Sequence, residues 1–154
     1  MIQIPPESAN SLTALEQQNL PLRFVIFHLH PTSARLRYLK FDSGHVCAPK
    51  KLPVLTEVLD RYKEGAGPSV HPQTYLRPLC RQLAVAESTL SIAGEFRCWV
   101  DTPSGALPIY LARVQLEQPF DAPDGCDWIE LPDCLLLSNV EIEIMRRAYQ
   151  WLLE

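Results

Sequence analysis

The chain has 154 residues, of which 47% are hydrophobic and 21% are charged, and its formal net charge is −4. This composition is typical of a globular protein, and the length fits one domain, which we place over 21–154. The negative charge argues against a broad nucleic-acid surface, because phosphate binding needs an excess of Lys and Arg. No apolar run reaches the roughly 20 residues of a membrane span, so we expect no membrane contact either.

The N-terminus lacks both the basic region and the apolar stretch of a secretory signal. The five cysteines are an odd number with irregular spacing, which favours free thiols over a disulfide framework. We therefore expect a cytoplasmic protein with reduced cysteines, since disulfides are rare in reducing compartments. Residues 1–20 are expected to form a flexible or partly helical arm.

The first predicted strands lie in the N-terminal third of the chain. Residues 22–29 are rich in branched and aromatic side chains, and residues 35–41 alternate between polar and apolar. The break at 30–33 contains a proline, so the two runs are expected to pair as an antiparallel hairpin. Residues 45–48 are a candidate for a third, short strand.

Two helices are predicted in the middle of the chain. Residues 51–64 have Pro53 in a position suited to a first helical turn. Their apolar residues recur with helical spacing: Leu55, Val58, Leu59 and Tyr62. The second pattern covers 72–84 and contains Pro78, which should either delay the start of the helix or kink it.

A long hairpin is the clearest β element. Two apolar runs between Phe96 and Leu116 flank the turn Thr102–Gly105. Pro103 suits the first corner of this turn, and Gly105 suits a positive φ that closes it. Both faces of the hairpin carry apolar residues, so other elements should cover it. Shorter strands are predicted at 88–92 and 127–131.

A final helix is predicted after Ser138, because Ser138 and Glu141 have the spacing of a capping box. Glu143 and Arg147 are placed to pair on its wet face. The predicted buried stripe consists of Ile142, Met145, Tyr149 and Leu152.

These elements predict an α+β fold. We expect a single domain with an antiparallel sheet of five or six strands, packed on one face against two or three helices, one of which is C-terminal.

Four side chains near the N-terminus are candidates for a metal site. His28 and His30 are two residues apart, so on a strand they share a face, and His45 and Cys47 repeat that spacing. If the two segments met, four nitrogen and sulfur ligands would converge, as in a zinc site. The alternative is that the histidines are ordinary residues at the edge of the core.

No cofactor motif or nucleophile motif is present, so we expect no cofactor. Glu95 and Asp101 share a strand face with Arg97 between them, which indicates a charged row. Trp151 lies off the stripe of the final helix. We therefore take Trp151, Arg97 and Trp99 as the candidate interaction surface, since exposed aromatics and Arg make good binding anchors.

Two functions remain open at this point. The preferred one is a non-catalytic binding or adaptor module, because every search for a catalytic motif fails. The alternative is a small enzyme or ligand-binding domain with a pocket between the sheet and the helices, with His28, His30, His45 and Cys47 as candidate residues. The expected partner is another protein or a second copy, with a homodimer slightly favoured over a monomer.

Overall fold

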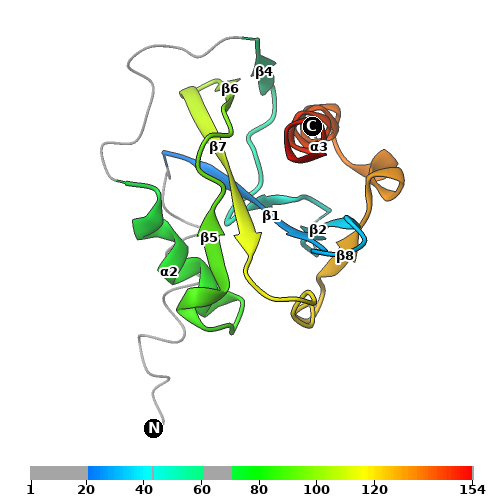
Figure 1. Cartoon of the computed structure of the whole chain (residues 1–154). Helices are drawn as coiled ribbons and strands as arrows, with labels where there is room; N and C mark the ends of the chain where they lie inside the picture. The colour runs from blue at the N-terminus through cyan, green and yellow to red at the C-terminus, as the bar shows by residue number, and fades with distance from the viewer. Residues whose placement is uncertain (1–20, 43, 61–70, 154) are drawn as a thin grey trace, which may run out of the picture.

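The computed structural model describes residues 21–42, 44–60 and 71–153. In these residues the chain is an α+β protein whose mixed sheet lies between two helices, α2 (Gln73–Gln82) and α3 (Asn139–Leu153), as Figure 1 shows. The predicted fold class and C-terminal helix are confirmed. The predicted arm over 1–20 lies outside the described residues.

The described strands number eight. They are β1 (Arg23–Leu29), β2 (Leu36–Lys40), β3 (Cys47–Ala48), β4 (Glu57–Leu59), β5 (Leu90–Ile92), β6 (Cys98–Thr102), β7 (Gly105–Val114) and β8 (Asp127–Ile129). Two 3₁₀ turns, η1 (Glu87–Thr89) and η2 (Leu131–Leu136), precede β5 and α3.

Both predicted hairpins are present. β1 pairs antiparallel with β2, with Phe27 opposite Tyr38, and β6 pairs antiparallel with β7. The second hairpin turns between Thr102 and Gly105, and Gly105 has the positive φ that the sequence predicted, at 122°. The residues at the two turns therefore predicted both hairpins correctly.

The predicted purely antiparallel sheet of five or six strands is wrong in two respects. The sheet has eight strands, and its central pair β1–β7 is parallel, with Phe24 opposite Tyr110. The main strand order is β4-β6-β7-β1-β2-β8, so the two hairpins are joined through β1 and β7. A pairing between segments so distant in sequence leaves no local pattern. The continuous apolar run of β1 is nevertheless typical of a central parallel strand covered on both faces.

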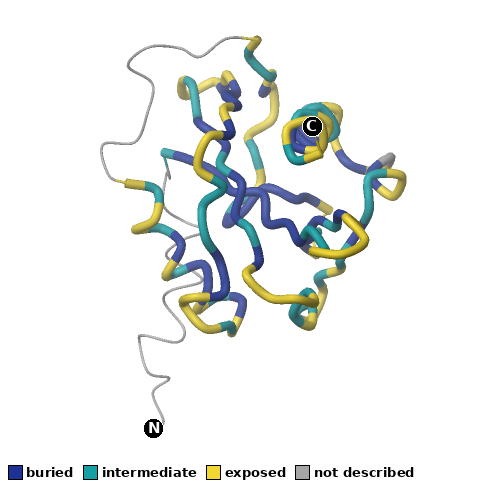
Figure 2. The backbone as a smooth tube through the Cα atoms, viewed as in Figure 1, coloured by how far each residue is buried: buried dark blue, intermediate teal, exposed yellow. Residues whose placement is uncertain are grey.

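The sheet is covered on both faces, whereas the sequence predicted helices on one. Successive residues of β1 point to opposite sides, so Val25 and Phe27 pack with α3 while Phe24 and Ile26 pack with α2. Figure 2 shows the buried backbone running through the centre of the sheet. The helix residues that complete the two cores are Ile144, Met145 and Ala148 from α3, and Leu76, Leu79 and Cys80 from α2.

The helix predicted over 51–64 is absent from its described part, 51–60. Leu55 has a φ of +66°, which no helix interior allows, and residues 57–59 form β4. β4 pairs with β6, placing Leu59 opposite Trp99. The helical spacing of apolar residues was outweighed by these ladder hydrogen bonds, and residues 61–64 lie outside the described residues.

The second predicted helix is confirmed as α2, with Pro78 inside it. α3 is confirmed as well, but its buried stripe is rotated from the predicted one. Its buried residues are Glu141, Ile144, Met145 and Ala148, whereas Tyr149 is 42% exposed. No helix in the described parts of the chain is long and apolar enough to cross a membrane.

The predicted capping box of α3 is only half formed. Ser138 Oγ accepts a hydrogen bond from the Glu141 backbone N–H at 3.3 Å. The Glu141 carboxylate instead turns into the core, where one oxygen accepts from the backbone N–H groups of Val46 and Cys47 at 2.9 and 3.0 Å. Buried N–H groups need partners, and this need outweighs the local reciprocal cap.

Candidate functional site

A cavity of about 450 Å³ lies between the β6–β7 hairpin, β5 and the start of α2. This volume is in the range of small-molecule sites. The residues around it are His71, Pro72, Ile92, Gly94, Phe96, Arg97, Cys98, Trp99, Pro108, Ile109 and Tyr110. The cavity therefore combines a largely apolar, aromatic wall with a few polar groups, as ligand sites in proteins commonly do.

Arg97 supplies the fixed positive charge of this cavity. Its Nη1 donates to the backbone carbonyls of Gly94 and Phe96 at 3.2 and 3.3 Å, which anchors one side of the guanidinium. Its Nε and Nη2 have no hydrogen-bond partner within the described residues. A guanidinium held in this way keeps donors for a carboxylate or phosphate.

His71 adds a second donor at the start of α2. Its Nδ1 accepts a hydrogen bond from the backbone N–H of Gln73 at 3.1 Å. In the neutral ring the proton must then sit on Nε2, which becomes a donor. The first turn of α2 contains no acidic residue, so nothing there offsets the partial positive charge of the helix N-terminus.

Cys98 lines the same cavity but is unsuited to act as a nucleophile. The thiol is 3% exposed, and burial raises the pKa of Cys98 to about 11. At neutral pH it is therefore a protonated thiol, whereas nucleophilic attack needs the thiolate. Cys98 acts in this cavity as a small apolar wall residue.

A smaller cavity of about 340 Å³ adjoins the first, and the two share Phe96 and Arg97. Glu95 and three residues of α3 complete its wall: Arg147, Gln150 and Trp151. The Trp151 ring packs edge-on against Phe96, with centroids 5.8 Å apart. α3 thus packs against Phe96, a residue that lines both cavities.

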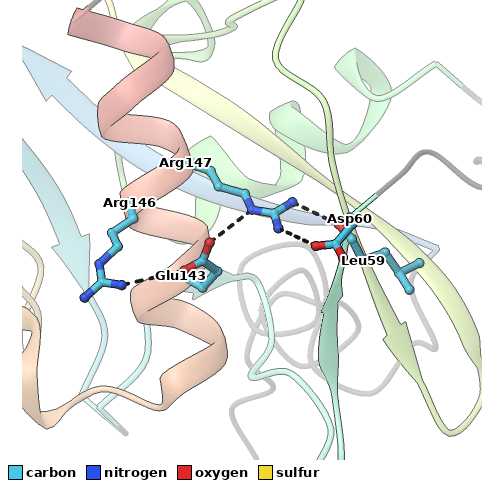
Figure 3. A network of polar contacts seen from close by, with 5 residues as sticks. All are labelled: Leu59, Asp60, Glu143, Arg146 and Arg147. Carbon is cyan, nitrogen blue, oxygen red and sulfur yellow. Dashed lines mark hydrogen bonds and ion pairs between the residues drawn. The ribbon is translucent and has the colours of Figure 1, made fainter.

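Arg147 ties α3 to the edge strand β4, as Figure 3 shows. It donates to the Leu59 carbonyl at 2.9 Å, and it pairs with Asp60 at 3.4 Å and with Glu143 at 3.3 Å. The predicted Glu143–Arg147 pair is therefore present. Leu59 in β4 pairs with Trp99 in the neighbouring strand β6. By holding Leu59, Arg147 therefore helps to position the cavity wall that contains Trp99.

The structure does not bring the four candidate metal ligands together. The His28 and His30 rings lie 6.3 Å apart, while His45 stacks on Phe41 and Cys47 pairs with Val25 in the sheet. In the described residues, no group of three or more His, Cys, Asp or Glu side chains is placed to hold a metal ion.

Of these four candidates, His28 and Cys47 are the most deeply buried. His28 is 1% exposed, and its Nε2 donates to the carbonyls of Leu116 and Glu117 at 2.9 and 3.1 Å. Burial, together with the neighbouring Glu141 carboxylate, raises the pKa of the Cys47 thiol well above its usual range. A buried thiol of this kind is inert.

The three candidate interaction residues lie at the two cavities. Arg97 and Trp99 line the main cavity and Trp151 the adjoining one; Trp99 is only 6% exposed, whereas Trp151 is 39% exposed. Sequence reasoning did not place His71 or Tyr110 at a site. The local signal for His71 was its position directly before Pro72, the N-cap residue of α2.

Comparisons with known proteins give a likeness of fold. No protein-family model matches the sequence, and no curated protein is similar to it. The structure is similar to the crystal structure of the C. elegans Ap4A hydrolase, with a TM-score of 0.50 and 14% sequence identity over 84% of this chain and 94% of that chain. At this identity the likeness shows a shared fold alone.

The preferred sequence-based function, a non-catalytic binding or adaptor module, is wrong. The chain shares its fold with the C. elegans Ap4A hydrolase, and it has a ligand-sized cavity between its sheet and α2. Both findings favour the alternative, a small enzyme or ligand-binding domain. The motif searches did not detect this cavity because its residues come from separate segments of the chain, and such sites leave no motif.

Proposed function

We propose that the chain is a small enzyme or ligand-binding domain that takes a nucleotide-type ligand in the cavity between the β6–β7 hairpin and the start of α2. The observation that carries this proposal is the cavity lining, which combines Arg97 with Tyr110 and with the largely buried aromatic residues Phe96 and Trp99. A nucleotide offers a planar ring for aromatic contacts and an anionic group for a guanidinium.

Two further observations support this ligand class. His71 and the N-terminus of α2 add donors and partial positive charge to the same cavity. The protein with the similar fold is named for its action on Ap4A, a molecule with two adenine rings joined by phosphates. Adenine nucleotides are therefore the first ligands to test.

Filling the cavity should weaken binding without disturbing the fold. Gly94 lines the cavity, a Cβ added to it would meet no heavy atom within 4 Å, and its φ is outside the left-handed region. We expect wild-type protein to bind ADP or Ap4A in isothermal titration calorimetry, and Gly94→Leu to weaken binding by about tenfold or more, since one misplaced side chain displaces ligand contacts.

Asn139→Leu is the matched control, because it adds the same side chain at an exposed position at the start of α3. It should bind like the wild type. Chromatography of the Ap4A mixture distinguishes the two forms of the proposal: release of mononucleotides identifies an enzyme, and intact Ap4A with saturable binding identifies a ligand-binding domain. Equal affinity of Gly94→Leu and wild type would place the ligand elsewhere.

Self-association remains a separate prediction. Three large side chains at the end of α3 are well exposed: Tyr149, Trp151 and Leu153, at 42%, 39% and 39%. Tyr149 and Leu153 are four residues apart and share one face of α3, while Trp151 lies on another face beside Phe96. Exposed apolar groups favour pairing, and a symmetric dimer is the commonest closed assembly. Light scattering over a dilution series should give a dimer mass that Trp151→Ala reduces; a monomer mass at every concentration contradicts the prediction.

A further inference from the structure

Two residues that line the main cavity, Arg97 and His71, offer it hydrogen-bond donors. Arg97 presents N–H groups of its guanidinium, and His71 presents the Nε2 proton. No carboxylate is among the described residues that line this cavity. α2, whose first residues border the cavity, contains neither Asp nor Glu.

A divalent cation needs a different lining. Magnesium is held through oxygen ligands, usually one or two carboxylates together with the phosphates of the bound ligand. In phosphoryl-transfer sites such cations bridge the ligand phosphates to protein oxygens and neutralise their charge. The cavity supplies a guanidinium where such a site would supply carboxylates, and a cation beside Arg97 would be repelled.

Resting on the proposed function, we propose that the ligand is bound as the free anion, with its charged group held directly by Arg97 and His71 and no divalent cation between protein and ligand. Arg97 then performs the neutralising role that a metal ion performs elsewhere. Magnesium bound to the nucleotide lowers the ligand's negative charge, so it should weaken the attraction to Arg97 rather than strengthen it.

Glu95 is the nearest alternative to this proposal. It lines the adjoining cavity, two residues from Arg97, and it has no ion pair within the described residues. One carboxylate with several waters and the ligand phosphates is sufficient for a weak magnesium site. A test must therefore separate capture by Arg97 from a magnesium bridge to Glu95.

ADP binding should be measured by calorimetry in excess EDTA and in excess magnesium, for the wild type and three variants. We expect the wild type to bind in EDTA at least as tightly as in magnesium. Arg97→Gln should weaken binding in EDTA by about ten- to a hundredfold, the range of a charge-assisted hydrogen-bonded contact. Arg97→Lys should recover part of the loss through its charge, and Glu95→Gln should change neither value.

The possible outcomes distinguish direct capture by Arg97, a magnesium bridge to Glu95, and failure of the proposed function itself. Binding that appears only in magnesium and is lost in Glu95→Gln overturns direct capture by Arg97 but leaves the proposed ligand class standing. Binding in EDTA that Arg97→Gln leaves unchanged also overturns it. Absence of ADP and Ap4A binding in both buffers, with correctly folded protein by circular dichroism, overturns the proposed function itself.

Discussion

Replacing Glu141 by leucine should destabilise the protein by about 2–5 kcal/mol, because it leaves two buried backbone donors without an acceptor. The carboxylate is 3% exposed, and one of its oxygens accepts from the N–H groups of Val46 and Cys47. Leucine has a similar size but cannot accept a hydrogen bond. The free energy of unfolding in urea, at pH 7, measures the effect.

Two comparisons make this result specific. Glu141→Gln keeps a side-chain acceptor and should lose less stability than Glu141→Leu. Glu117→Leu makes the same change at an exposed side chain and should shift stability by no more than about 0.5 kcal/mol. If Glu141→Leu and Glu117→Leu have the same midpoint, the contact between α3 and β3 does not support the fold.

Met145→Ala is the second large expected effect, with a loss of about 2–5 kcal/mol. Met145 is fully buried in the core between α3 and the sheet. Truncation removes apolar contacts and leaves a cavity that the sheet cannot fill. The Tyr38 hydroxyl donates to the backbone carbonyl of Met145 at 3.2 Å, and this bond does not depend on the side chain.

Gln150→Ala is the control for that measurement, since Gln150 is exposed on the same helix. It removes side-chain atoms without opening a cavity and keeps helix propensity high. Thermal and urea unfolding should give matching rank orders for the two variants. A Met145→Ala midpoint equal to that of Gln150→Ala would mean that α3 packs only loosely on the sheet.

The chemistry of the site depends on the same framework that these variants test. α3 reaches β4 through Arg147, β4 pairs with β6, and β6 carries Arg97's neighbours Cys98 and Trp99 into the cavity wall. Loosening α3 should therefore disturb a ligand site on the sheet as well as the core. A ligand that binds only the folded chain should in turn raise its unfolding midpoint.

Much of the local structure follows from the sequence. The β6–β7 hairpin is specified by a turn with proline and glycine, and its Gly105 has the positive φ that only glycine adopts readily. α2 and α3 follow from helical spacing, and α3 begins where Ser138 caps it. Each of these signals acts between residues close in the chain, so one sequence contains it in full.

Other features were decided by contacts between distant segments. Residues 57–59 pair with β6 and form a strand despite their helical spacing, and Glu141 leaves its local cap to satisfy Val46 and Cys47. The buried stripe of α3 therefore includes Glu141 and differs from the predicted stripe, and Tyr149 is exposed to solvent. Ladder hydrogen bonds and buried N–H groups outweigh weak local propensities, because an unpaired buried polar group costs more than a propensity difference.

The sequence by itself determined the α+β class, the two hairpins, α2 and α3, because periodicity and turn chemistry act locally. Only the tertiary structure decided the parallel β1–β7 pairing and the position of the cavity. His71 precedes α2, Arg97 precedes β6 and Tyr110 belongs to β7, so they share one cavity only after the hairpin and the helix dock on the sheet. That docking depends on burial of apolar surface from the whole chain, which no short motif encodes.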